Sequence, residues 1–284
     1  SFKGKNFQTA LDLLGGDFIV DNDKYAERDF PNDSLALQND LDVPNKIVKE
    51  GEQYGYNYNT HIRSAQPWAQ LDFTLRKFDI FAAANVGFTN IWREGLVRNG
   101  RFPDNSRGNS EKQKFTTYGI KAGTTYKLNG RNYLYANAGY MTQAPLVRDI
   151  FQSPRTRNTT IPNLTTEKTL SAEAGYILRA PVLKARVSAY YTQFRDLART
   201  TSFYHDELRT FVNFNLNGIG RTHIGTEIGL DYKISPSFLV QAAANLGDYY
   251  YDTRAYADIS QDNNNTLVAD DRLVYQKDFF VANT

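Results

Sequence analysis

The feature that most constrains the fold is a strict alternation of apolar and polar side chains, repeated in hairpin segments from about residue 66 onward. The clearest hairpin runs from Leu170 to Tyr191 and turns at residues 179–182. Because successive side chains of a strand point to opposite faces, each segment has one apolar face and one polar or charged face. The pattern therefore predicts an antiparallel sheet. Its apolar side is either a soluble core or a lipid-facing wall around a wet lumen.

The lengths of the connections favour the membrane wall. Short turns at 76–79, 128–131, 179–182 and 234–237 alternate with much longer segments. Outer-membrane barrels have this layout, with short turns at the periplasmic rim and long loops outside. We therefore predict an all-β, antiparallel transmembrane β-barrel. The expected extracellular loops are 11–52, 93–112, 145–166, 197–220 and 251–277.

The polar face carries ionised side chains that a dry protein core would not accommodate, because ionised groups are rarely buried without partners. We expect this face to line a lumen or to contact an inserted plug. The opposite face is rich in Ala with single Leu, Ile or Val, which suits lipid tails because nothing has to interlock there. A thinly packed soluble sandwich is the alternative fold. The charged residues predicted to face the lumen are Asp72, Arg76, Lys121, Glu173, Lys184, Arg186, Glu227 and Asp231.

The composition agrees with a barrel and excludes several other classes. Aromatic residues make up 14% of the chain, with 19 Tyr and 18 Phe, as two membrane-interface girdles would require. There is no Cys, which excludes a disulfide framework and a thiolate metal site. The net charge of +2 is too small to indicate a nucleic-acid partner.

Neither a catalytic centre nor a metal site is expected, so the enzyme class is disfavoured. His205 lies beside Asp206 and Glu207, but solvated side chains of a long loop are the simpler interpretation. The acidic run from Asp258 to Asn264 lacks the Gly and Glu that an EF-hand needs at its sixth and twelfth positions. We therefore predict no catalytic residue, no metal and no cofactor.

Arginine and aromatic side chains occur together in the expected loops. Arg forks bind carboxylates or phosphates, and aromatic faces stack on sugars or flat chelates. Three interpretations stay open: a ligand mouth, contacts with lipopolysaccharide phosphates, or ordinary loop surface. The candidate ligand-binding residues are Arg98, Arg101, Phe102, Arg155, Arg157, Phe203 and Tyr204.

A series of short motifs follows in order along the chain. They are Asp12–Asp17 with Gln38–Leu41, Asn163–Lys168, Ala189–Asp196, Gly225–Glu227 and Tyr275–Val281. In order and spacing, this series resembles the later barrel strands of TonB-dependent outer-membrane receptors of the Bacteroidetes type. The resemblance covers most of the chain.

This resemblance implies part of a 22-stranded barrel with a plugged lumen, located in the bacterial outer membrane. It also implies TonB-energised uptake of a scarce nutrient, such as a siderophore, vitamin, glycan or peptide. The implied partners are outer-membrane lipid, lipopolysaccharide, a plug domain and TonB, while a surface lipoprotein partner is left open. Residues 1–284 show no plug, no TonB-contacting segment and no terminal aromatic strand. We therefore expect a partial barrel domain that depends on parts outside it.

Two other functions stay open at this point. The first is an outer-membrane scaffold or secretion conduit without active import. The second, an outer-membrane hydrolase, is disfavoured because the sequence offers no convincing pair of nucleophile and His.

Overall fold

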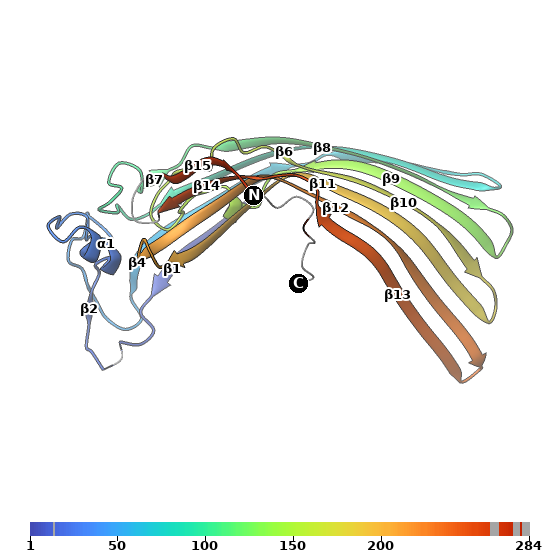
Figure 1. Cartoon of the computed structure of the whole chain (residues 1–284), viewed down its shortest axis with the longest axis horizontal. Helices are drawn as coiled ribbons and strands as arrows, with labels where there is room; N and C mark the ends of the chain where they lie inside the picture. The colour runs from blue at the N-terminus through green and yellow to red at the C-terminus, as the bar shows by residue number, and fades with distance from the viewer. Residues whose placement is uncertain (14, 262–266, 275–278, 280–284) are drawn as a thin grey trace.

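The computed structural model describes residues 1–13, 15–261, 267–274 and 279, and antiparallel strands make up most of it (Figure 1). Eight strands form a wall in which each strand runs opposite to its neighbours. This confirms the predicted all-β antiparallel fold. In order of pairing, the strands are β5 (Trp68–Thr74), β6 (Phe78–Gly95), β8 (Gln113–Lys127), β9 (Asn132–Gln143), β10 (Glu167–Arg179), β11 (Leu183–His205), β12 (Thr210–Ser235) and β13 (Phe238–Tyr251).

The wall is a curved, open sheet with its short turns at one end, opposite the helix α1 (Lys24–Asp29) (Figure 1). At the turn between β8 and β9, the Asn129 side chain accepts hydrogen bonds from the backbone N–H groups of Arg131 and Asn132, at 2.9 and 3.0 Å. An Asn side chain that replaces a backbone acceptor in this way favours a tight reversal. The short turns that the sequence predicts are therefore present.

Each face of the wall keeps its character across the strands. One row of paired residues consists of Leu71, Ala82, Ala122, Ala138, Ala172, Tyr191 and Ile224. The adjacent row, on the other face, consists of Asp72, Phe81, Gly123, Asn137, Glu173, Tyr190 and Gly225. The apolar face has no protein over it, since Ile120 is 63% exposed and Ile228 is 46% exposed. We call it the outer face and the opposite one the inner face.

Aromatic residues mark both ends of the apolar band on the outer face. Next to the short turns, Phe78 and Tyr126 stack with ring centroids 4.8 Å apart. Towards the other end, Tyr118 and Tyr140 lie 5.8 Å apart. The stretch of β6 from Phe78 to Phe88 extends about 33 Å along the strand, or about 25 Å in height at a barrel tilt of about 40°. This height matches the apolar band of outer-membrane barrels.

Opposite the short turns, the strands continue far beyond this band. β11 and β12 contain 23 and 26 residues, whereas about 9–11 residues cross a membrane. Residues 197–220, expected as a loop, are therefore mostly paired strands, with their reversal at 206–209. The pairing of β11 with β12 shifts register near Asp196, whose φ is 55°. Because this shift interrupts the alternation of apolar and polar residues, the sequence pattern does not show that the strands continue beyond it.

The other long connections also contain short elements. Residues 11–52 hold β2 (Ile19–Val20), α1 and β3 (Ile47–Val48), while 93–112 holds β7 (Gly108–Asn109) and 145–166 holds the 3₁₀ turn η1 (Val147–Asp149). The described part of 251–277 forms β14 (Tyr256–Gln261) and β15 (Leu267–Leu273), which extend the sheet from β12. On the opposite side, β4 (Gln53–Ala65) pairs with β6, and β1 (Phe2–Thr9) pairs with β4. The last quoted motif, at 275–281, lies outside the described residues apart from Phe279.

Buried apolar side chains gather at this extended end. One cluster joins Ile91 and Phe115 of the wall to Ile150 and Phe151 of the 145–166 connection. A second joins Leu197, Ile219 and Ala255. No helix among the described residues is long and apolar enough to cross a membrane.

Candidate functional site

The inner face carries a charged cluster at the middle of β10 and near the start of β11. The Arg186 Nη2 lies 2.6 Å from the Glu173 Oε1, and the Arg186 Nε donates to the Tyr135 hydroxyl at 3.0 Å. The Tyr135 hydroxyl in turn donates to the Glu173 carboxylate. All three side chains come from adjacent strands in register, so the cluster satisfies charges across the wall.

Except for Arg76, the other charged residues predicted to face the lumen lie on the inner face of the strands. Gln70 donates to Asp72 at 2.9 Å, Gln241 donates to Asp231 at 3.0 Å, and Asn245 donates to Glu227 at 3.3 Å. Lys184 lies directly opposite Asp231, and Lys121 lies over the Phe81 ring. Arg76 is in the turn between β5 and β6 and not in a strand.

A polar and aromatic ladder continues up the inner face on β11, β12 and β13. The hydroxyls of Tyr190 and Tyr249 lie 2.7 Å apart. His223 then packs edge-on against Tyr249 at 4.9 Å and against Phe194 at 5.2 Å, and Arg221 lies over the Phe194 ring. This ladder presents hydroxyls, rings and a cation to the lumen.

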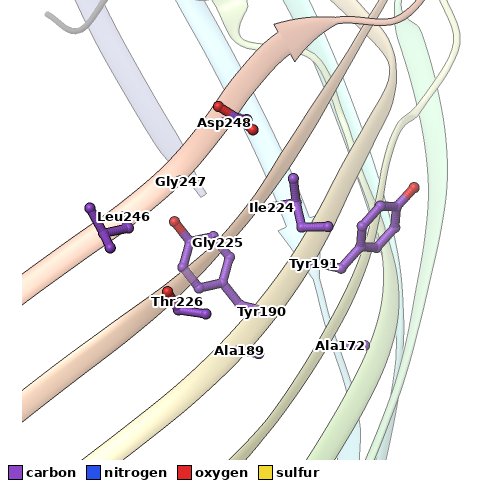
Figure 2. Close-up of a pocket in the computed structure, with 10 residues that line it drawn as sticks. All are labelled: Ala172, Ala189, Tyr190, Tyr191, Ile224, Gly225, Thr226, Leu246, Gly247 and Asp248. Carbon is purple, nitrogen blue, oxygen red and sulfur yellow. The ribbon is translucent and has the colours of Figure 1, made fainter.

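Glycines let the inner aromatic side chains lie flat across neighbouring strands. Tyr190 reaches towards Gly225, whereas Tyr191 points away from it (Figure 2). A Cβ on Gly225 would lie 2.6 Å from both the Tyr190 hydroxyl and the Leu246 carbonyl oxygen. The residues drawn in Figure 2 come from both faces of the sheet, so they do not enclose one ligand site.

At the extended end, the 145–166 connection folds onto the inner face around the buried Arg93. The Arg93 Nε donates to the Pro154 carbonyl at 2.7 Å and its Nη1 donates to the Ser106 carbonyl at 2.7 Å, and Nη1 also binds Asn158. Burial lowers the pKa of Arg93 to about 10, so the guanidinium stays charged at neutral pH. This cation holds two long connections together at the mouth of the lumen.

Three of the predicted ligand residues are part of this folded layer. The Arg101 Nη2 pairs with the Asp23 Oδ2 at 2.6 Å, and both side chains are largely buried. Arg157 is fully buried over the ring of Phe102, 4.8 Å from its centroid, and Phe102 is itself buried. These contacts join the 11–52, 93–112 and 145–166 connections.

The remaining predicted ligand residues reach solvent. Arg98 is exposed and lies 3.6 Å from Asp42, and Arg155 is exposed above the Tyr56 ring at 5.3 Å. Phe203 and Tyr204 are exposed near the tip of the β11–β12 hairpin, away from Arg155 in the sequence and on a different element. The structure thus separates the predicted group into a buried layer, a mouth and a hairpin tip.

Sequence reasoning assigned no binding role to a tyrosine stripe at the mouth. Tyr54, Tyr56 and Tyr58 lie at alternate positions of β4. Tyr58 pairs with Gly95 of β6, which places it on the inner face beside Arg93, and the Tyr56 ring lies 6.0 Å from the Tyr58 ring. Arg93 lies over the Tyr58 ring at 5.0 Å, and burial raises the pKa of the Tyr58 hydroxyl. The Tyr-x-Tyr-x-Tyr alternation was the available signal, because alternate residues of a strand share one face.

Within the described residues, no group of three or more His, Asp or Glu side chains is arranged to hold a metal ion. The acidic residues at 21–23 serve the local fold. Asp21 accepts from Asn39 and from the Gly55 backbone, and Asp23 caps α1. In the acidic run from Asp258 to Asn264, residues 262–264 lie outside the described residues.

One solved structure has a fold similar to this architecture. Among solved structures, the chain is similar to the copper transporter OprC, with 12% identity and a TM-score of 0.56 over 76% of this chain and 35% of that chain. It is also aligned with the siderophore receptor PirA from Pseudomonas aeruginosa, with 10% identity and a TM-score of 0.29 over 73% of this chain and 54% of that chain. Comparison with curated proteins gives no match.

The two structural relatives differ from this chain in length and sequence. The chain spans about a third of the copper transporter, and at this identity the likeness concerns the fold alone. The match to a family is much broader, since residues 2–282 match the family described as "TonB dependent receptor-like, beta-barrel". The chain therefore belongs to the TonB-dependent receptor β-barrel family of outer-membrane proteins.

Proposed function

We propose that the chain forms part of a receptor that imports a scarce nutrient across the outer membrane with energy from TonB. The observation that carries this proposal is the two-sided wall. Its outer face is apolar and uncovered, while its inner face is lined with charges, hydroxyls and rings from the mouth to the short turns. A pore wall for a polar nutrient needs both properties.

The ligand mouth that we propose consists of Arg155 with Tyr54, Tyr56 and Tyr58. An exposed guanidinium next to tyrosine rings suits an anionic ligand or one with flat or hydroxyl-rich groups. Arg98, Phe203 and Tyr204 stay candidates for outer contacts, because their side chains reach solvent. Arg101, Phe102 and Arg157 would act indirectly, by holding the layer that supports the mouth.

The remaining parts of the proposal follow from the family. We assign residues 1–284 to one partial barrel domain of the Bacteroidetes type, in a barrel of about 22 strands, with its long connections outside the cell. The charged inner face would contact a plug supplied by another part of the protein, and TonB would act through that plug. Catalysis has no role in this proposal.

The test is uptake by cells that carry the complete receptor, compared with cells lacking the receptor or lacking TonB. Each strain is grown with one limiting nutrient at a time: ferric siderophore, cobalamin, copper, oligosaccharide or peptide. The proposal requires one nutrient whose uptake needs both proteins. Export of a substrate that depends on the receptor but not on TonB would favour a secretion conduit instead.

A further inference from the structure

A cluster of cations lies on the outer face just above the apolar band. Arg63 and Lys114 flank Asn90 in one row of paired residues, and Asn90 lies two residues beyond Phe88, where the apolar band of β6 ends. Lys112 precedes Lys114 on the same side. Lys3 and Lys5 of β1 extend the cluster, which we call the outer basic patch.

The centre of the patch is the buried ring of Trp92. His61 stacks on it with ring centroids 4.8 Å apart and an angle of 4° between the planes. Arg63 and Lys112 lie over the same ring, at 5.3 and 5.1 Å from its centroid. The indole therefore contacts two cations at once, and both of these side chains stay exposed.

The charges of the patch are poorly balanced within the protein. Glu94 is its main acid, and it already lies 2.8 Å from His61 and 3.4 Å from Lys3. By contrast, other cations at a similar height on the outer face have their own carboxylates. Lys168 pairs with Asp196 at 2.6 Å, and Arg195 pairs with Asp252.

The height of the patch indicates its partner. Two residues beyond Phe88 correspond to about 7 Å along the strand. The headgroup layer of a bilayer adds about 5–8 Å on each side of the hydrocarbon. Exposed cations at this height, facing away from the lumen, meet the headgroups of the outer leaflet and not the transported ligand.

We propose that the outer basic patch binds the phosphate groups of a phosphorylated glycolipid in the outer leaflet, with Arg63 and Lys112 as the central contacts. Arg forks and Lys ammonium groups bind phosphate oxygens directly. The inference rests on the membrane placement of the wall, and it holds whichever nutrient the receptor imports.

The test uses the complete receptor in detergent, with diphosphorylated lipid A as the probe and a chelator present to remove divalent cations. Bound lipid is counted by native mass spectrometry. The patch variant R63Q/K112Q/K114Q is compared with K24Q/K49Q/R148Q, which removes three exposed cations from the outer connections. A difference in gel mobility between heated and unheated samples confirms that the barrel of each variant is folded.

We expect the patch variant to bind lipid A at least about tenfold more weakly, and the control variant to stay within about twofold of wild type. Lipid A without its phosphates should bind weakly to all three proteins. Equal binding by the two variants would overturn the proposal, as would displacement of the lipid by equimolar inorganic phosphate. Nutrient uptake, measured separately in cells, distinguishes loss of lipid binding from loss of import.

Discussion

At the scale of single residues, the inner face depends on glycines that make room for rings. Gly225 is the sharpest case, because a Cβ there would meet the Leu246 carbonyl oxygen of the neighbouring backbone at 2.6 Å. Gly229 lies four residues further along the same face, and nothing would lie within 4 Å of its Cβ. The two positions therefore separate steric conflict from the general effect of adding a methyl group.

We predict that Gly225→Ala destabilises the folded barrel by about 1–3 kcal/mol, the usual cost of overpacking. Gly229→Ala should change the free energy of unfolding little. Urea titration of the complete receptor in lipid vesicles measures both. Equal stability of the two variants would show that Tyr190 and the strand can move aside without cost.

A second residue-scale prediction concerns acid stability. Hydrogen bonds from His61 and then Asn59 lower the pKa of the Glu94 carboxyl to about 2, whereas an unfolded Glu has a pKa of about 4.3. The ionised Glu94 therefore stabilises the fold fully above about pH 5, and this contribution is lost as the pH falls from about 4.3 to about 2.

Glu94→Gln should consequently lower the thermal unfolding temperature near neutral pH, and its difference from wild type should shrink as the pH approaches 2. Thermal unfolding of both proteins across this range is the measurement. A difference that stays constant down to pH 2 would mean that the charge of Glu94 contributes nothing.

At the scale of elements, the extended β11–β12 hairpin supports the distant helix α1. Phe211 on β12 packs edge-on against Tyr25 of α1 at 5.8 Å and against Tyr204 of β11 at 5.6 Å. A helix of six residues is too short to be stable alone, so it depends on such contacts.

We predict that Phe211→Ala makes trypsin cleave several-fold faster at Lys24 and Arg28, because α1 opens more often. Phe203→Ala is the matched control, since its ring contacts His205 of the same strand. Limited proteolysis followed by mass spectrometry identifies the cut sites. Similar cleavage of both variants would locate the support of α1 elsewhere.

The sequence predicted the elements of the wall well and those of the mouth poorly. Within the apolar band the alternation is regular because one face of every strand meets a single apolar environment, so strands and faces can be read directly from the sequence. Beyond the band both faces meet water or other connections, and the alternation no longer has one cause. The bulge at Asp196 and the extension to His205 were therefore missed.

At the scale of the whole molecule, the outer face should lie in lipid. We predict that Ile228→Cys in the complete receptor resists a membrane-impermeant maleimide in intact membranes and reacts after unfolding in urea. Glu207→Cys, in the exposed hairpin turn, should react at once. Equally fast labelling at both positions would place the apolar face in water.

The candidate site was predictable only in part, because its charges acquire partners from segments that are far apart in the chain. Arg101 and Asp23 are 78 positions apart, and no local pattern marks them as a buried pair. Glu173 and Arg186 were easier, since a tight turn joins their strands and fixes the register. Family membership supplied the setting, and the structure distinguished the exposed Arg155 from the buried Arg157.

The two-sided register of the wall also limits how such a gene can change. Losing one codon within β10 would shift every later position of that strand by one and turn Glu173 towards the hydrocarbon. Losing two would restore the orientation. Length changes that survive selection within the wall should therefore come in even numbers, whereas the long connections tolerate any number, and alignments of relatives can be checked for this parity.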